Sequence, residues 1–442
     1  MTENVLSADS KQPHDEDVAA GTISEELSLE DDKRLLRRID LFLLPVMAVS
    51  YMFQFLDKSA LGFTAVMGLR DDLRLSGEDF SWASGIYYFG YLVASYPASM
   101  LMVRWRVAKT IAVAVVFWGA AHMIPAVANN AAGLLTLRFF LGIFESPIAP
   151  GLTAIAVFLI FGGATFAWAF AIAFFLPDVP TTAWFLSQND RSKVITRVRE
   201  NITGIKSNEF KWPQCREALL DVKTWFVALI QLCANIPDGG VHSFGSIVVQ
   251  GLGFSEFQTL LLQSGSYLVQ FALVLIATGG STYLRNTRTY FMVWNFALSI
   301  LGSVLIREYQ GEQRWVSYAG FRLVIALGAN FPLMMAIISG NFGGFTKKIT
   351  VKAICFIAYC AGNIIGPQLF FAREAPSYPS GFLAMMVCFC ICLLSCIALQ
   401  VYLIMENRRR DSIVDAPETD EVDGSMMANL MDKTDKEIPQ FS

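Results

Sequence analysis

Long apolar runs separated by short polar segments dominate the chain. In the first part, runs lie near 40–64, 79–103 and 107–127, a fourth starts near 131, and another occupies 154–176. A hydrophilic segment follows at 178–222, and six further runs lie near 223–250, 258–280, 289–306, 316–339, 351–372 and 381–404. Most runs approach the ~20 residues that a helix needs to cross ~30 Å of hydrocarbon. Because the bilayer core offers the backbone no water, we predict an all-α polytopic membrane protein.

The pattern divides the chain into five regions. Residues 39–177 form an N-terminal helical bundle of about five spans, and 223–405 form a C-terminal bundle of six helices. Residues 178–222 are predicted to be a cytosolic central loop. The tails at 1–38 and 406–442 are polar, and we expect both to be disordered and cytosolic. The acidic start contains no apolar segment typical of a cleaved signal peptide.

Composition agrees with a membrane protein. The 442 residues are 54% hydrophobic and 16% charged, whereas a soluble domain is about 25% charged. The net charge of −4 gives no indication of a nucleic-acid partner. The eight cysteines include no CxxC pair, so we expect neither a metal site nor another cofactor.

The orientation follows from basic residues beside short loops, which mark the cytosolic side. Basic clusters lie at 33–38, 104–109, 285–288, 347–348 and 408–410, and the central loop is also basic. These positions are mutually consistent only if the central loop is cytosolic. Five spans after a cytosolic start would place that loop on the opposite side.

The first half therefore contains one span too few. No polar loop separates Gly151 from Ala154, and the sequence from Ala131 to Leu176 is almost continuously apolar. Our interpretation is that one span and its flanking loops are missing near residue 153, either through a misplaced splice boundary or through a real deletion. A re-entrant or tilted helix pair is the alternative that would restore the parity.

Several sequence blocks carry a family resemblance. They are RRIDLFLLPVMAVSYMFQFLDKSALG at 37–62, RFFLGIFESPIAPG at 138–151, FLPDVPTTAWFLSQNDR at 175–191, FKWPQCREALLDVKTW at 210–225, NIPDGG at 235–240, GGFTKK at 343–348 and GNIIGPQLF at 362–370. Together they resemble the fungal allantoate permease family, the anion:cation symporter branch of the major facilitator superfamily. The resemblance implies two six-span halves, here with 11 rather than 12 transmembrane helices because the fifth span is missing.

Four candidates stand out among the ionisable residues inside predicted spans, where a charge is costly and usually faces a cavity or a partner. Arg138 and Glu145 are seven residues apart and share one helix face, whereas the adjacent Asp57 and Lys58 point about 100° apart. In the functional interpretation, Arg138 binds an organic carboxylate bidentately and Lys58 is the second cation. Asp57 or Glu145 then carries a coupling proton. The alternative is a structural ion pair between helices, such as Asp57 with Arg138.

Two motifs rich in Pro and Gly add Asn235 and Asn363 to the candidate binding residues. NIPDGG would interrupt the seventh helix and GNIIGP the eleventh, which would free backbone groups to line a substrate cavity. A simple kink is the alternative. We interpret His122 and His242 as packing or interfacial residues. The sequon at Asn201 would remain unused in a cytosolic loop.

The resemblance implies a secondary active transporter. We expect proton-coupled uptake of a small organic anion similar to allantoate, nicotinate or a related carboxylate, by a monomer in the plasma membrane. The alternatives are an exporter that works by proton antiport and a truncated paralogue or receptor that transports nothing. The chain contains no HExxH, GxSxG or Walker motif and no paired metal ligands, so we expect neither an enzyme nor a primary pump.

Overall fold

The computed structural model describes residues 41, 61–104, 113–118, 120, 130–145, 210–284, 287–309, 313–414 and 434. The candidates Asp57, Lys58 and Asn201 lie outside the described residues, as do His122 and the chain around residue 153. All regular elements within the described ranges are helical.

The N-terminal part contributes three of these helices. They are α3 (Leu69–Asp72), α4 (Gly77–Arg104) and α6 (Ala131–Glu145). The side-chain hydroxyl of Ser76 accepts a hydrogen bond from the backbone N–H of Asp79 at the start of α4. The amide oxygen of Asn130 caps the first turn of α6 in the same way. Both starts therefore satisfy backbone donors that a helix end leaves unpaired.

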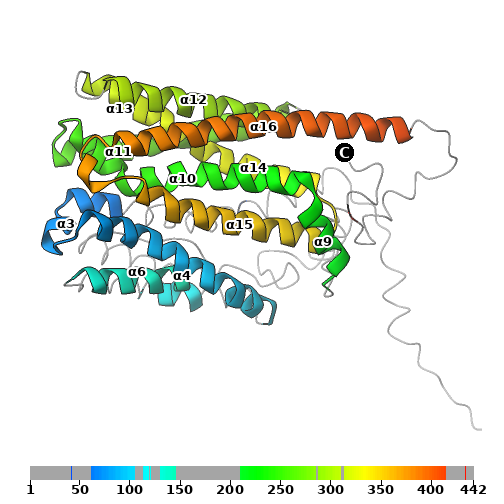
Figure 1. The fold of residues 1–442 in the computed structure, drawn as a ribbon, viewed down its shortest axis with the longest axis horizontal. Coiled ribbons are helices and arrows are strands. Elements are labelled where there is room, and N and C mark those ends of the chain that lie inside the picture. Colours follow the sequence, from blue (N-terminus) through cyan, green and yellow to red (C-terminus); the bar gives the residue numbers. More distant parts are fainter. Residues whose placement is uncertain are drawn as a thin grey trace, which may run out of the picture.

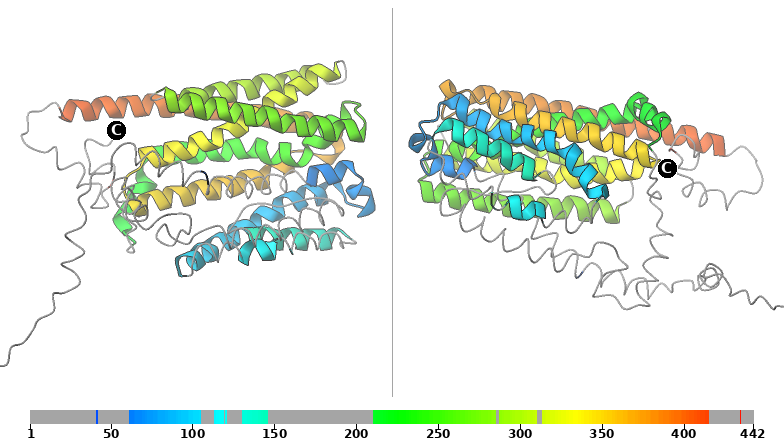
Figure 2. Two further views of the ribbon diagram at one scale, coloured as in Figure 1. Left: turned by 180° about the vertical axis from the view of Figure 1, so that it is seen from behind. Right: turned by 90° about the horizontal axis from the view of Figure 1, so that it is seen from below.

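The C-terminal part forms the helices that the apolar runs predict. They are α9 (Trp212–Leu220), α10 (Val222–Gly251), α11 (Glu256–Tyr283), α12 (Arg288–Tyr309), α13 (Arg314–Val324), η3 (Ile325–Ala329), α14 (Asn330–Asn341), α15 (Phe345–Gln368), η4 (Ala372–Glu374) and α16 (Pro379–Val414). The long helices run side by side (Figure 1), and the views in Figure 2 show the same bundle from behind and from below. The helix α9 was not predicted, because its residues belong to the expected central loop.

Helix length and composition agree with a membrane-embedded bundle. Among the described residues, five helices are long and apolar enough to cross a bilayer, or six if the bent pair α9–α10 counts as one span. Large apolar side chains such as Leu268, Phe271, Leu394 and Val401 are exposed on the outside of α11 and α16. An apolar outer surface is what lipid tails require.

The most extensive pairing among the described helices joins α10 to α15. A Cβ added at Gly362 would lie 2.7 Å from the carbonyl oxygen of Leu232, and one at Gly239 would lie 2.9 Å from the Cα of Asn363. A Cβ at Gly366 would overlap the carbonyl of Ile236. Small residues allow membrane helices to approach to backbone contact. The Pro- and Gly-rich motifs therefore serve helix packing, and neither α10 nor α15 is interrupted within its bounds.

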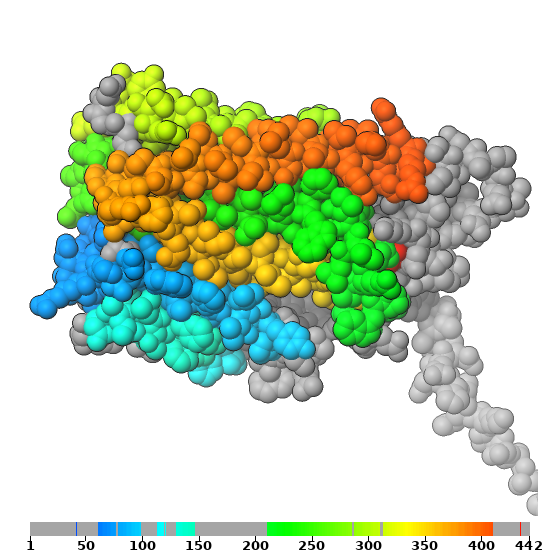
Figure 3. Space-filling model, in the orientation of Figure 1, coloured from blue at the N-terminus to red at the C-terminus, as the bar shows by residue number. Residues whose placement is uncertain are grey.

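The N-terminal helices cover one side of this pair. Figure 3 shows α4 and α6 forming one continuous surface with α15. At the end of the bundle that carries α3, the ring of Phe80 from α4 meets that of Phe244 from α10 at 5.2 Å. Phe244 stacks on Phe370 at 4.9 Å, and Tyr378 packs against both. An aromatic cluster thus closes this end between the two halves.

We expect the substitution Gly366→Ala to destabilise the protein by about 1–3 kcal/mol, because the added methyl group meets backbone atoms that cannot move aside. Thermal unfolding of the purified protein, followed by size-exclusion chromatography, measures the effect. Gly279→Ala on α11 is the matched control, since no described atom lies within 4 Å of its added Cβ. Equal midpoints for the two variants would show that the α10–α15 contact is looser than described.

Candidate functional site

A cavity of about 430 Å³ lies inside the C-terminal bundle. Its walls come from α10, α11, α12, η3, α14 and α15, and Tyr91 reaches it from α4. This volume falls in the range of small-molecule sites, which combine apolar walls with a few polar groups. The polar and ionisable lining residues are Tyr91, Gln231, Asn235, Asp238, His242, Gln270, Asn330, Lys352 and Tyr359.

One stripe of polar side chains on α10 forms a wall of this cavity. Gln231, Asn235, Asp238 and His242 follow one another at intervals of three or four residues, so one helix face presents all of them. The amide nitrogen of Asn235 donates to the carbonyl of Gln231 at 2.6 Å. The imidazole Nε2 of His242 lies 3.4 Å from the carboxylate Oδ1 of Asp238. The stripe therefore ends in an acid–base pair.

The helix α15 supplies a cation to the same cavity. Lys352 lines the cavity and its side chain is exposed. Tyr359 lies seven residues later on the same helix face, about 10 Å further along the axis. A lysine among apolar walls and amide side chains can bind an anionic solute through a charge-assisted hydrogen bond.

A hydrogen bond between two asparagines supports the opposite wall. The amide nitrogen of Asn295 on α12 donates to the amide oxygen of Asn330 at 2.8 Å, and Asn330 lines the cavity. Asn295 is fully buried. The bond holds the first turn of α14 against α12, where η3 breaks the regular helix.

The structure brings the two predicted asparagines together. The amide nitrogen of Asn363 donates to the amide oxygen of Asn235 at 3.1 Å and to the carbonyl of Tyr359 at 3.0 Å. Asn235 lines the cavity, whereas Asn363 is fully buried behind it. The pair therefore fixes the position of α10 against α15 in a low-dielectric environment.

Arg138 and Glu145 lie elsewhere, on the buried face of α6. Arg138 lines a second, small void of about 20 Å³, large enough for about one water molecule. Gly239, His242 and Ser243 line this void from α10. His242 thus belongs to both spaces, and Arg138 is not among the residues around the larger cavity.

Sequence reasoning missed Asp238, His242 and Lys352 as site residues. The expected break at NIPDGG concealed the helical spacing that places Asp238 and His242 on the same face as Asn235. Lys352 stands at the predicted start of a span and looked like a boundary residue. A search for polar residues repeated every three or four positions would have identified Asp238 and His242.

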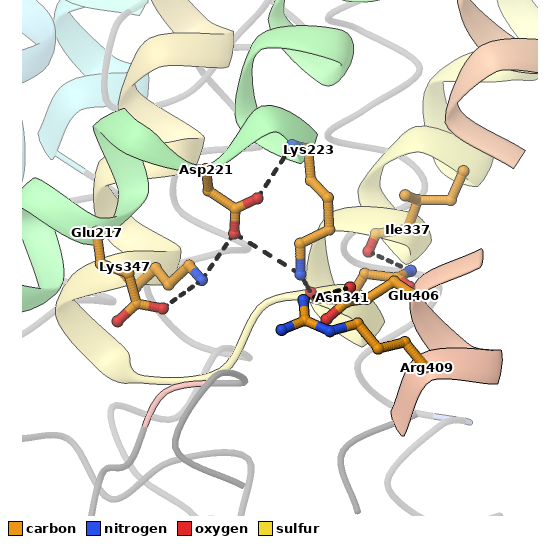
Figure 4. A network of polar contacts seen from close by, with 8 residues as sticks. All are labelled: Glu217, Asp221, Lys223, Ile337, Asn341, Lys347, Glu406 and Arg409. Atoms are coloured by element: carbon orange, nitrogen blue, oxygen red, sulfur yellow. Dashed lines mark hydrogen bonds and ion pairs between the residues drawn. The ribbon is translucent and has the colours of Figure 1, made fainter. Parts of the chain in front are cut away.

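A second polar cluster lies at the end of the bundle that carries α9 (Figure 4). The ammonium group of Lys347 is fully buried and lies 2.8 Å from the carboxylates of both Glu217 and Asp221. Asp221 also lies 3.7 Å from the ammonium group of Lys223, which donates to the carbonyl of Asn341 at 2.9 Å. The cluster ties the bend between α9 and α10 to the end of α14 and the first turn of α15.

This cluster positions the helix that carries Lys352. The side chain of Gln214 on α9 accepts a hydrogen bond from the backbone N–H of Thr346 at 3.1 Å. A Cβ added at Gly344, which has a φ of 79°, would lie 2.9 Å from that side chain. The first turn of α15 is therefore held by α9, and Lys352 follows it by little more than one turn.

The described residues contain no group of three or more His, Cys, Asp or Glu side chains that could hold a metal ion.

Apolar spanning helices around a polar cavity define a membrane transporter of small solutes. The family model for the Major Facilitator Superfamily matches residues 47–157. The Schizosaccharomyces pombe protein named Uncharacterized transporter C417.10 is 33% identical, over 88% of this chain and 85% of its own length. Allantoate permease of Saccharomyces cerevisiae is 30% identical, over 94% and 87%. The chain therefore belongs to the major facilitator superfamily, among the fungal transporters related to allantoate permease, and is not an enzyme.

A solved structure agrees with this fold. An inward-facing, unoccupied bacterial homologue of the human lysosomal transporter Spinster superposes with a TM-score of 0.53 at 14% identity, covering 82% of this chain and 96% of that one. At this identity the likeness concerns the fold alone.

We expect Lys347→Met to destabilise the protein by about 3–5 kcal/mol, because it leaves the buried carboxylate of Asp221 without its closest cation. Thermal unfolding in detergent measures the change. Arg409→Ala is the control from the same end of the bundle: Arg409 is 74% exposed beside Glu406, and its loss should cost about 0–1 kcal/mol. A Lys347→Met protein as stable as wild type would contradict the buried network.

Proposed function

We propose that the protein is a proton-coupled importer of a small organic anion, a carboxylate similar to allantoate or nicotinate. The observation that carries this proposal is the cavity inside the C-terminal bundle, in which a cation and an acid–base pair lie among amide side chains. The relationship to allantoate permease supports the carboxylate class.

The cavity suits an anion that also carries polar groups. Lys352 supplies a positive charge. Gln231, Asn235, Gln270 and Asn330 supply amide groups, which both donate and accept hydrogen bonds. A solute with a carboxylate and additional amide-like groups would engage both sets, whereas a plain hydrocarbon acid would leave part of the hydrogen-bonding capacity of these amides unused.

The roles of the predicted ionisable residues remain part of the proposal. Arg138 is a second cation near the pathway, separated from the larger cavity by the wall that contains His242. Glu145 is fully buried on the same face of α6. Lys58 keeps its proposed role in anion binding. Asn235 keeps its place in the cavity wall, and Asn363 supports it from behind through their hydrogen bond.

We further propose a monomer in the plasma membrane, with both tails and the loop before α9 in the cytosol. The cluster around Lys347 then lies at the cytosolic end, and the aromatic cluster around Phe244 closes the outer end. Export by proton antiport is the second candidate, because alternating access allows either direction.

The missing fifth span is also a proposal, and the relatives support it. The alignment with transporter C417.10 has 437 positions but includes 88% of the 442 residues, so at about 48 positions the relative has a residue and this chain has none. The corresponding number for allantoate permease is about 61. Either number suffices for one span of ~20 residues and its flanking loops.

Uptake by the purified full chain in liposomes tests the proposed function. We expect labelled allantoate or nicotinate to accumulate when the outside is more acidic, and the accumulation to collapse with a protonophore. Nicotinamide, which lacks the carboxylate, should not compete. Loss of preloaded solute from the liposomes under the opposite pH gradient would favour export. Absence of any solute flux would favour a paralogue that transports nothing.

Substitution of Lys352 tests the assigned cavity. We expect Lys352→Ala to raise the apparent KM for the anion about tenfold to a hundredfold, because it removes a charge-assisted hydrogen bond. Lys352→Arg retains the charge and should have a smaller effect. Lys348→Ala is the matched control, since it removes a positive charge from the same helix at a residue that does not line the cavity. Equal KM values for Lys352→Ala and Lys348→Ala would exclude Lys352 as an anion ligand.

Sequencing of the mature transcript across the codons for Pro150 to Phe158 tests the missing span. We expect an insertion that encodes roughly one additional apolar run of ~20 residues with its loops. A transcript identical to the present chain would exclude a misplaced splice boundary and favour a real deletion. Glycosylation of Asn201 would then show whether the central loop faces the lumen.

A further inference from the structure

We propose that the Asp238–His242 pair on α10 is the proton-binding site that couples solute movement to the proton gradient. This inference rests on the proposed function, and it assigns to α10 a role that the sequence had suggested for Asp57 or Glu145.

The first argument is the position of the pair. The two side chains are one helical turn apart, with 3.4 Å between Nε2 of His242 and Oδ1 of Asp238. They are 13% and 21% exposed, so they contact the interior space without being fully solvated. Both line the larger cavity, and His242 also lines the small void beside Arg138. The pair therefore forms part of the wall between the solute cavity and the arginine of the N-terminal half.

The second argument is the chemistry of the pair. Imidazole is the side chain that ordinarily changes its charge between pH 5 and 8. With a neutral imidazole the pair has a charge of −1, and with a protonated imidazole it is neutral. Two protonation states that differ by one charge at the edge of a solute site are what a coupling group requires.

The surrounding charges set the direction of the coupling. Among the described residues, the ionisable groups that line the two spaces with the pair are Lys352, Cys355 and Tyr359 from α15, Arg138 from α6, and Tyr87, Tyr88 and Tyr91 from α4. Lys352 and Arg138 provide two positive charges, and the carboxylate of Asp238 opposes them. An anion that enters beside an unprotonated pair meets this negative charge, and protonation of His242 neutralises it.

Proton binding and anion binding therefore favour each other. By thermodynamic linkage, an anion that binds more tightly to the protonated pair must also raise the affinity of the pair for the proton. Loading of both on the acidic side and release of both on the alkaline side follows from this reciprocity. The proton site lies on α10 and Lys352 lies on α15. Because these two helices pack closely against each other, the proton site and the anion-binding lysine belong to one helix pair.

The test compares two transport modes of the full chain in liposomes, with labelled allantoate and nicotinate as probes. A gradient of one pH unit supports about tenfold accumulation if one proton accompanies each monovalent anion. Exchange between equal pH on both sides requires anion binding and conformational change but no net proton movement. We expect Asp238→Asn and His242→Gln to reduce accumulation to about the level without a gradient while exchange continues.

Two further variants serve as controls. Asp238→Glu keeps a carboxylate one methylene further out and should restore part of the accumulation. Asp72→Asn makes the same chemical change in α3, where the exposed side chain lines neither cavity, and should accumulate solute as wild type does.

The outcomes separate this inference from the proposed function. Wild-type accumulation that does not respond to the pH gradient would show that proton coupling itself is wrong. A responsive wild type together with Asp238→Asn and His242→Gln variants that accumulate equally well would overturn the assignment to this pair. Loss of both exchange and accumulation in a monodisperse Asp238→Asn protein would also overturn it, because the pair would then serve anion binding or structure.

Discussion

The backbone contact between α10 and α15 is the constraint on which the rest of the site depends. Glycines at 239, 362 and 366 let the two helices approach until carbonyl groups of one face Cα atoms of the other. At that separation, short side chains such as Asn235 and Asn363 can bond directly across the interface. Bulkier residues at these three positions would push the two helices apart. The two cavity walls that these helices form would then separate as well. Packing and recognition therefore use the same residues.

Polar groups inside this bundle fall into two kinds with different physical roles. The Lys347 cluster and the asparagine pairs are bonded to one another and are almost inaccessible, so they fix one arrangement of the helices. Lys352, Asp238 and His242 line the cavity, where a solute can reach them. A transporter needs both kinds, because rigid helices must move as units while the charges at the solute site change partners.

The sequence predicted the fold well and the site only in part. Apolar runs of spanning length predicted the bounds of α10, α11 and α12 to within three residues, since the bilayer imposes length and composition on each span. The run near 316–339 is divided among α13, η3 and α14, α15 begins six residues before its predicted run, and α16 extends ten residues beyond its run. Of the two predicted asparagines, Asn235 lines the cavity, whereas Asn363 lies behind it. The pair at Asp238 and His242 was missed because Pro237 and two glycines suggested a broken helix. In the structure those residues pack against α15, and only the tertiary contact distinguishes packing from a break.

In the proposed orientation, the length of α16 has a separate consequence for the cytosolic side. Its 36 residues form a rod of about 54 Å at 1.5 Å per residue, against ~30 Å of hydrocarbon. In Figure 1 the excess extends past the end of the bundle, beside α9. The helix thus acts as a stalk that begins the C-terminal tail at a distance from the headgroups. A fluorescent protein or kinase recruited to that tail would be held clear of the bilayer surface and of the helices that rearrange during transport.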